Sequence, residues 1–298
     1  MDISTKFSDS RTAKYLEKRK FKVATSYKLN NKIINIKLFF FKETSEIDIE
    51  LILKKIHLLI LLFFYKKSTN ININIYFTHF KKMMPLDNDF TSYNVNSGVR
   101  SFYPHLNNIT IYREEEWFKV LIHELFHALN FDNKFDNFVH PRITDKFNIK
   151  NLNLFSETYV ELWATFYNVI ITVFLSNKIF SKNIDNYLRK EFMHCIDQNK
   201  KILHKFNTNY QNEIEKPSFV YLEKQNILYY YLFKMILFYK LNEFLTICES
   251  DNNLLQLNKE KTTKLLDLIL NTYKKPAFTR LIKHKRLRKT RNLKMTIT

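Results

Sequence analysis

The spacing of apolar residues divides the chain into an early part of mixed pattern and a later part that is helical throughout. In the early part, Ile- and Phe-rich runs alternate with polar residues, and one longer apolar run over 46–67 has helical spacing. The alternating runs predict strands over 31–42, 70–80 and 108–113, with an edge strand or turn over 91–103. After about residue 156, the spacing predicts helices over 156–177, 183–206, 217–247 and 260–273.

This order of elements predicts an α+β fold in two parts. Residues 26–135 would form an N-terminal mixed sheet with helices, and residues 136–275 a mainly helical part that supplies the other wall of a cleft. Residues 1–25 are polar and charged and are expected to form a lead-in, while residues 276–298 are expected to form a basic tail.

One helix of the early part carries the most informative motif of the chain, the run HELFH at residues 123–127. Three glutamates at 114–116 crowd its first turn, where carboxylates favour the positive end of the helix dipole. The sequence NFDN at 130–133 ends it, with an asparagine able to adopt a left-handed cap. The predicted buried stripe consists of Trp117, Val120, Leu121, Leu125 and Ala128.

The motif has the form H-E-x-x-H, with His123, Glu124 and His127 at its fixed positions. Histidines four residues apart lie on one helix face, about 6 Å apart, and both can reach one Zn²⁺. Glu124 is turned by about 100° from His123, so it would lie beside the metal as a general base and not ligate it. Three fixed positions also occur by chance in helices, so the motif needs a third ligand to support it.

Several residues could provide that third ligand. The longer pattern H-E-x-x-H-x-x-G-x-x-H fails, because Asn130 and Asn133 stand at its glycine and last histidine positions. Glu157 and Glu161 are four apart on the next predicted helix, and two carboxylates on such an apolar helix are costly to bury without a charged partner. Remaining alternatives are Asp132, which is more typical of a helix end, and His140, a loop histidine.

The motif helix and the following glutamate pair resemble zincin metallopeptidases of the gluzincin, thermolysin-like type. That family has H-E-x-x-H followed by E-x-x-x-D on the next helix. The resemblance implies that His123, His127 and Glu157 bind zinc, that Glu124 is the base, and that Glu161 orients a histidine ligand. The chain departs from the pattern by a glutamate at 161 and by a longer gap between the helices.

Over residues 92–170 the chain also resembles metallopeptidase-like proteins of giant DNA viruses, which share its strand, both helices and its AT-biased composition. The family resemblance implies a zincin-like fold with an edge strand that holds extended substrates. The stretch VNSGVRSFY is the candidate strand, and Gly98 would allow close backbone approach, although an ordinary turn glycine is an equal alternative. The family also uses a tyrosine or histidine to stabilise the oxyanion, and the open candidates are Tyr229, Tyr230, Tyr231 and His204.

The net charge of +19 widens the range of partners beyond a peptide or protein substrate. Ten basic residues and no acidic one lie between Lys274 and Lys294, so about half of the excess belongs to the predicted tail. Such a tail could bind nucleic acid or another polyanion, or act as a nuclear signal, and a solvated tail without a partner is an equal alternative.

The remaining composition bears on location. Cys195 and Cys248 are too few for a disulfide scaffold and are expected to be buried thiols. The first residues lack a signal-peptide apolar core, and the longest apolar runs, 56–65 and 163–175, are shorter than the roughly 20 residues of a membrane span. These features predict an intracellular protein, and for a viral protein a location in host cytoplasm or virion.

The sequence therefore predicts zinc-dependent peptide hydrolysis, with a water at the metal activated by Glu124. The alternative from another class is a non-catalytic, zincin-like basic binding protein, such as a virion or nucleoprotein component. Glu124 discriminates between them, because a binding protein does not need a general base beside its histidines.

Overall fold

The computed structural model of the 298-residue chain describes fourteen stretches of residues. These are residues 15, 21–29, 32–41, 48–64, 69–86, 90–103, 106–132, 141–143, 146–147, 154–176, 180–206, 208–215, 227–286 and 290–298.

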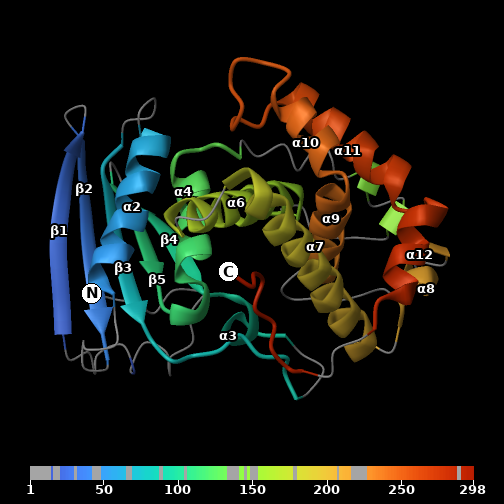
Figure 1. The fold of residues 1–298 in the computed structure, drawn as a ribbon, viewed down its shortest axis with the longest axis horizontal. Helices are drawn as coiled ribbons and strands as arrows, with labels where there is room; N and C mark the ends of the chain where they lie inside the picture. The colour runs from blue at the N-terminus through green and yellow to red at the C-terminus, as the bar shows by residue number, and fades with distance from the viewer. Residues whose placement is uncertain are drawn as a thin grey trace.

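A five-stranded mixed sheet forms the N-terminal part of the molecule (Figure 1). The strand order is β1-β2-β3-β5-β4, so β4 lies at one edge. The inner pairs β2·β3 and β3·β5 are parallel, and the outer pairs β1·β2 and β4·β5 are antiparallel. The strands are β1 (Phe21–Leu29), β2 (Lys32–Phe40), β3 (Ile71–Phe77), β4 (Gly98–Tyr103) and β5 (Leu106–Ile111).

The Asn–Ile alternation of β3 separates the two faces of this sheet. Ile71, Ile73 and Ile75 are buried, as alternation over a half-buried strand predicts. On the opposite face, Asn72 accepts a side-chain hydrogen bond from Asn35 of β2 and donates one to an asparagine of β5, both at 3.0 Å. The repeat therefore provides a core face and a hydrogen-bonded amide ladder at once.

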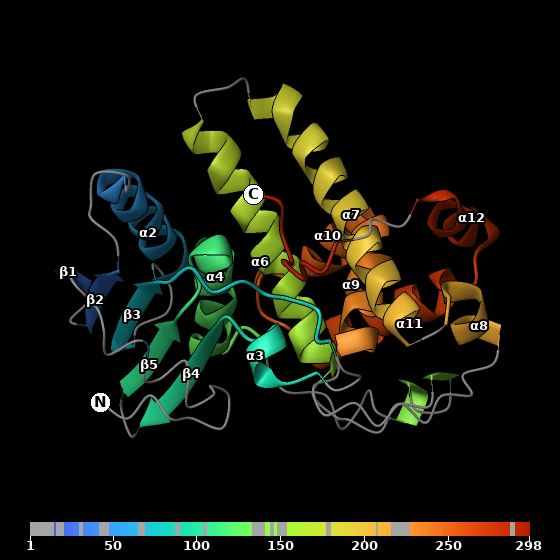
Figure 2. The same cartoon turned by 90° about the horizontal axis from the view of Figure 1, so that it is seen from below.

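Helices connect and cover the strands of this part. The crossover from β2 to β3 is α2 (Ile49–Phe64), which buries the face that carries Ile52, Ile56 and Phe63. A short helix, α3 (Ser92–Val95), precedes β4. After β5 the 3₁₀ turn η2 (Glu114–Glu116) leads into α4 (Trp117–Ala128), the motif helix. Figure 2 shows α4 between the sheet and the helical part.

The second part of the molecule is helical, and α6 packs its N-terminal half against α4 (Figure 2). A single buried apolar cluster includes residues of the sheet, of α4 and of the later helices, so the two parts share one core. The fold is α+β, as predicted. The helices are α6 (Leu154–Leu175), α7 (Phe180–Lys205), α8 (Tyr210–Glu215), α9 (Ile227–Tyr239), α10 (Leu241–Cys248), α11 (Lys259–Thr272) and α12 (Pro276–His284).

Several elements differ from the prediction, including α3 within the edge strand or turn expected over 91–103. β1 begins at Phe21, inside the expected lead-in, because its backbone pairs with β2 from Phe21 opposite Phe40. The helix expected over 217–247 is two helices, α9 and α10, separated at Lys240, and residues 216–226 lie outside the described residues. The predicted boundary between residues 135 and 136 also lies outside them.

The expectation of a basic tail over 276–298 is wrong for its first half, because Pro276–His284 form α12. Proline at the first turn suits a helix start, since its missing N–H has no partner there in any helix. Phe278 and Ile282, four apart, are buried at 0% and 2% exposure. This apolar pair was a readable helix signal within the basic run.

The last nine residues, 290–298, are also folded, and their end lies at the centre of the molecule (Figure 1). Leu293, Met295 and Thr296 are all buried. Backbone hydrogen bonds tie the segment to the loop after β3, with Leu293 donating to the carbonyl of Lys82 at 2.7 Å. Removal of residues 276–298 is therefore expected to expose core surface and to destabilise the protein.

Within the described residues, Phe155–Leu175 is long and apolar enough to cross a membrane by length and composition. Of its most apolar window, 67% is buried inside the protein. A core helix meets the same criteria, so this feature is weak evidence for a membrane span.

Candidate metal centre

The end of α4 is shaped by a left-handed asparagine. Asn130 has φ 53°, as its place in the NFDN sequence predicted, and its N–H donates to the carbonyl of His127 at 3.1 Å. Phe131 N–H donates to the carbonyl of Phe126 at 3.0 Å, and the two rings are 5.1 Å apart. This is a Schellman arrangement with its hydrophobic contact, and it reverses the chain directly after the helix.

The reversal brings Asp132 back to the motif. One of its carboxylate oxygens lies 2.9 Å from Nδ1 of His127. The sequence analysis considered Asp132 as a zinc ligand or a helix-end residue. The structure instead places it against the histidine nitrogen that faces away from the site. Sequence spacing did not reveal this role, although the cap-forming asparagine was a signal that the chain turns back here.

His123, His127 and Glu157 bring their ligand atoms together at one point. The two Nε2 atoms are 3.1 Å apart, and oxygens of Glu157 lie 3.2 Å from Nε2 of His123 and 3.4 Å from Nε2 of His127. The three residues form a group that could hold a metal ion. Glu157 comes from the first turns of α6, which pack against α4. The packing of the two helices thus brings together residues that are far apart in the sequence.

These distances are close to those between the ligand atoms of a small tetrahedral metal ion. With bonds of about 2.0–2.2 Å, neighbouring ligand atoms of a tetrahedron are separated by about 3.3–3.6 Å. The three observed distances lie within a few tenths of an ångström of that range. The Glu157 side chain is 43% exposed, whereas those of His123 and His127 are 14% and 15% exposed. The group is therefore open on one side, as a site needs if water or substrate is to complete the coordination.

Glu161 lies behind His123, one turn after Glu157 on α6. One of its oxygens is 3.1 Å from Nδ1 of His123, and its side chain is only 1% exposed. Each histidine therefore has a carboxylate at Nδ1, Glu161 for His123 and Asp132 for His127. Such partners hold Nδ1 as the N–H donor and leave Nε2 free to bind a metal.

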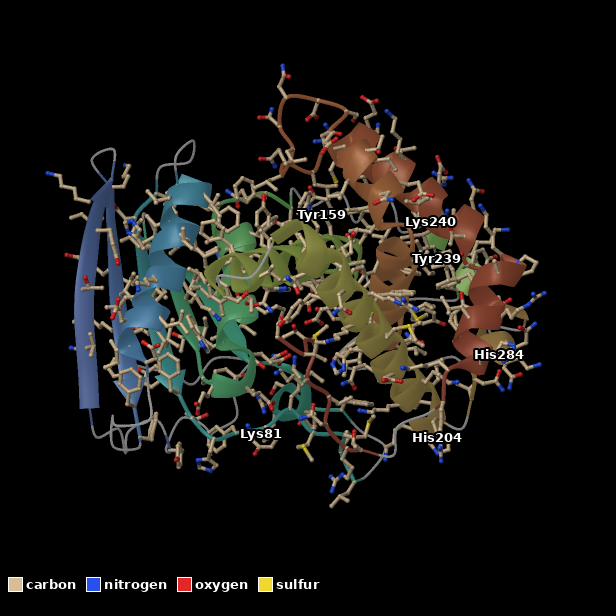
Figure 3. All side chains as sticks on the ribbon, in the orientation of Figure 1. Lys81, Tyr159, His204, Tyr239, Lys240 and His284 are labelled. Carbon is tan, nitrogen blue, oxygen red and sulfur yellow. The ribbon has the colours of Figure 1, made fainter. Side chains whose placement is uncertain are left out.

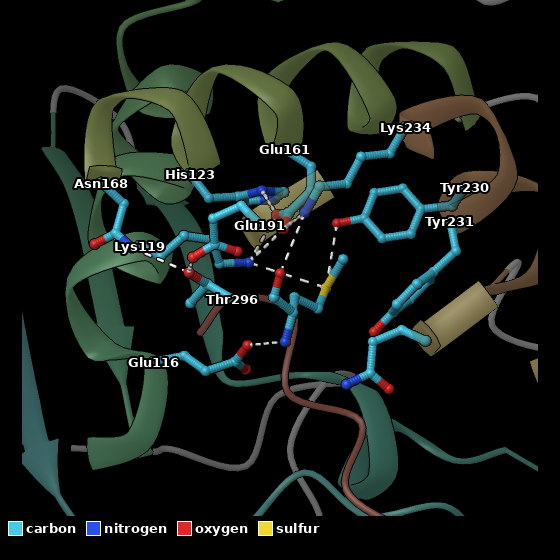
Figure 4. A network of polar contacts seen from close by, with 12 residues as sticks. Glu116, Lys119, His123, Glu161, Asn168, Glu191, Tyr230, Tyr231, Lys234 and Thr296 are labelled. Atoms are coloured by element: carbon cyan, nitrogen blue, oxygen red, sulfur yellow. Dashed lines mark hydrogen bonds and ion pairs between the residues drawn. The ribbon is translucent and has the colours of Figure 1, made fainter. Parts of the chain in front are cut away.

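Two buried lysines hold the Glu161 carboxylate in place (Figure 4). Lys119 of α4 lies 2.6 and 2.8 Å from its two oxygens, and Lys234 of α9 lies 3.1 Å from one of them. Burial alone would raise the pKa of Glu161, but the two positive charges outweigh it and hold that pKa well below the usual range. The two lysines thus favour the ionised form of Glu161 beside His123. Sequence analysis did not identify Lys119 or Lys234.

The ligand residues also influence one another's protonation. Burial would raise the pKa of Glu157, but His127 and His123 outweigh it and hold the pKa well below normal. Burial would lower the pKa of His127, but Glu157 and Asp132 reverse the shift and raise it well above normal. A bound cation would replace the protons on these side chains and balance the charge of Glu157 in their place, because metal binding requires deprotonated ligands.

Glu124 lies on α4 between the histidines and the edge strand β4. It is 9% exposed, and burial raises the pKa of its carboxyl group. None of the described residues donates a hydrogen bond to it. A carboxylate whose pKa moves upward from the usual range towards neutral pH is suited to accept and return a proton.

Gly98 permits the close approach of β4 to α4. A Cβ atom at this position would lie 2.7 Å from Cγ1 of Val120 and 3.3 Å from an oxygen of Glu124. No positive φ requires the glycine, so its function here is to leave space. Gly98 thus lies in a strand that packs closely on α4, and whether it also admits the backbone of an extended substrate stays a prediction.

The structure distinguishes among the oxyanion-donor candidates. The hydroxyl groups of Tyr229 and Tyr231 donate to the carbonyls of Phe147 and Leu293, which are structural contacts. His204 is exposed near the end of α7, well away from α4 (Figure 3). The ring of Tyr230 instead points toward Glu161 (Figure 4), and Glu161 and Glu157 both contribute, after burial, to raising its pKa.

Two other predictions concern single residues. Cys195 and Cys248 are buried free thiols, as expected. His140 lies outside the described residues, so its alternative role as a ligand stays untested.

Comparison with known proteins does not add a family assignment. No protein-family model matches the chain, and a search of curated proteins finds no match. The resemblance to gluzincins therefore stays a prediction that depends on the motif residues and their geometry.

Proposed function

We propose that the protein is a zinc-dependent peptidase in which His123, His127 and Glu157 hold the metal and Glu124 transfers the proton. The observation that supports this most strongly is the convergence of two Nε2 atoms and a carboxylate at the spacing of a tetrahedral ion. Two imidazoles and one carboxylate form a donor set typical of catalytic zinc. Each histidine also has the carboxylate partner at Nδ1 that zinc-binding histidines usually have.

In this proposal a bound zinc ion would supply Lewis-acid chemistry, polarising the scissile carbonyl and acidifying water. Glu124 would accept the proton of the attacking water and deliver it to the leaving amine. Its buried position supports this role, since burial raises the pKa of the carboxyl group and so makes it a stronger base. Glu157 would remain an anion and balance part of the metal charge.

Substrate would bind in extended form along β4. Among the strands that the structure describes, this one lies at the edge of the sheet, and such an edge could pair with a peptide. Gly98 keeps the strand close to Glu124, which would place the peptide carbonyl near both the base and the ligand group. Tyr230 is the residue we favour as oxyanion donor, because its ring points from α9 toward Glu161, one turn beyond the ligand Glu157.

The geometry favours an enzyme over a basic binding protein. A purely structural site would gain nothing from Glu124, whose side chain is mostly buried beside the ligand histidines. Burial of such a group has a free-energy cost, and chemistry at the open side of the site would account for its presence.

The decisive experiment combines metal analysis with peptide cleavage. Purified protein should contain close to one zinc per chain, and a peptide library should be cleaved by it. Treatment with a chelator should abolish cleavage, and added zinc should restore it. Protein without bound zinc after reconstitution would contradict the site. Zinc-loaded protein that cleaves no peptide would favour the binding-protein alternative. An intracellular location and a polyanion partner remain predictions that other measurements must test.

A further inference from the structure

The C-terminal segment 290–298 reaches the ion network that supports His123, and it does so through Met295. The carbonyl of Met295 accepts from Lys234 at 3.3 Å, and its Sδ lies 3.9 Å from Nζ of Lys119. The hydroxyl of Tyr230 also lies 3.6 Å from this sulfur. One residue near the end of the chain therefore contacts both lysines that hold Glu161.

The contacts of Lys119 show why Met295 matters there. An ammonium group has three N–H donors, and Lys119 directs two of them to the oxygens of Glu161. The sulfur of Met295 is the acceptor for the third. Lys119 is only 3% exposed, so a donor that loses its acceptor cannot turn to bulk water without moving.

Further contacts hold the segment in position. The N–H of Met295 donates to the buried carboxylate of Glu116, at the start of the motif helix. Glu191 of α7 accepts from Oγ1 of Thr296 at 2.5 Å and from the N–H of Ile297 at 2.9 Å (Figure 4). Asn168 of α6 donates to the hydroxyl of Thr298 at 2.5 Å. Met295 is thus fixed between three helices of the helical part and the start of α4.

We propose that residues 295–298 are a positioning element of the metal centre: Met295 fixes Lys119 and Lys234, these fix Glu161, and Glu161 fixes the ring of His123. This inference rests on the proposed metal site and assigns new positioning residues to it. It replaces the expectation from sequence, in which this segment was part of a basic tail. The chain end and the motif helix would act as one unit in metal binding.

The test is a double-mutant cycle on zinc affinity, measured by competition with a chromophoric chelator. Its arms are Lys119→Met, a chain that ends after Lys294, and the two changes combined. Each single change should weaken zinc binding by about 10–100-fold, as is typical when the residue behind a ligand is lost. The loss in the combined protein should be smaller than the product of the two single losses, because both changes act through Glu161.

A spectroscopic measurement separates positioning from general loss of stability. Saturating Co²⁺ should give shifted visible absorption bands in both single variants, since the bands report the geometry of the bound ligands. Lys264→Met is the matched control, because Lys264 pairs with Glu260 at 2.6 Å on the exposed surface of α11. This control should leave both affinity and spectrum unchanged.

Circular dichroism determines whether the shortened chain still folds. If it does not, Met295→Ala in the full chain replaces it in the cycle, with an expected loss of several-fold in affinity because the thioether side chain is removed while the backbone contacts of residue 295 remain. The inference would be overturned if the protein altered in residues 295–298 kept the zinc affinity and the Co²⁺ spectrum of the parent. It would also be overturned if the loss of zinc affinity in the combined variant equalled the product of the two single losses. If the parent chain itself binds no zinc, the proposed function fails, which is a separate result.

Discussion

The carboxylate of Glu161 lies 3.1 Å from Nδ1 of His123, at the position where the gluzincin motif has an aspartate. The glutamate side chain is longer by one methylene and would be free to adopt more conformations. Two buried lysines remove that freedom, with Lys119 alone bound to both oxygens. The substitution and the lysines therefore form one arrangement, in which the longer carboxylate is held where it meets the histidine ring.

Alanine substitution of each of the two α6 glutamates distinguishes the metal ligand from the residue that supports a ligand. Glu157→Ala should lose most bound zinc, because it removes one of three converging ligands. Glu161→Ala should retain measurable zinc at micromolar supply, with affinity lower by about 10–100-fold. Metal content of both dialysed proteins, measured by mass spectrometry, tests the contrast. The reverse order would mean that the two roles are exchanged, and two zinc-replete variants would show that the third ligand is elsewhere.

Replacement of Glu124 by glutamine should abolish catalysis and leave the metal bound. The amide is nearly isosteric but cannot accept the proton from water, so peptide hydrolysis should fall by several orders of magnitude. Zinc content should equal that of the parent, because Glu124 is not part of the ligand group. A Glu124→Gln protein that cleaves peptides at the parental rate would contradict the proposed mechanism.

Gly98→Ala should disturb the approach of β4 to the motif helix. The new Cβ would lie 2.7 Å from Cγ1 of Val120, so helix and strand must separate, at a cost of about 1–3 kcal/mol in the free energy of unfolding. Urea denaturation measures the loss. Val120→Ala removes the colliding methyl group, so the double variant should be less destabilised than the sum of the single variants. Strictly additive losses would show that steric contact is not the cause.

Asp132 should contribute to metal affinity although it does not ligate. Its carboxylate holds Nδ1 of His127 at 2.9 Å, and Asp132→Ala should therefore weaken zinc binding by about 10–100-fold. Asn130→Ala provides a related comparison, because alanine disfavours the positive φ of the cap that brings Asp132 back. If both variants bind zinc like the parent, this carboxylate is not a supporting residue.

Glu116 should make the stability of the protein sensitive to acid. Burial would raise its pKa, but Lys82, Lys119 and the N–H of Met295 outweigh burial and lower the pKa from 4.5 to about 2. As the pH falls, Glu116 takes up a proton in the unfolded chain before it does so in the folded protein. The stabilisation of the fold by the Glu116 charge is therefore complete above about pH 5 and is lost as the pH falls towards 2. Its size is on the order of 3 kcal/mol.

Urea denaturation of the parent and of Glu116→Gln, at several pH values between 7 and 2.5, tests this dependence. The difference between the two proteins should be constant near neutral pH and should shrink in acid. A difference that does not change with pH would show that the Glu116 charge is not the source.

Periodicity along the chain was enough to predict most of the fold. The strands β2, β3 and β5 and the helices α2 and α4 were predicted because each has a regular apolar face that the core requires. Several elements were not predicted, namely β1, α3, α8 and α12. β1 is stabilised by pairing with β2, and α12 by burial of only two of its apolar side chains. This stabilisation comes from contacts with other segments of the chain, and the local pattern of apolar residues does not predict such contacts.

The candidate site divides in a similar way. The sequence by itself determined that His123 and His127 share one helix face and that Glu157 and Glu161 share another, because helical spacing is a local property. Only the tertiary structure decided that these faces meet, that Asp132 turns back to His127, and that Lys119 and Lys234 enclose Glu161. Those contacts join segments separated by long stretches of sequence, and packing of the shared core selects them. The same packing buries the C-terminal segment, where carboxylates and carbonyl groups of other elements are its hydrogen-bond partners. The composition of the segment alone could not indicate these partners.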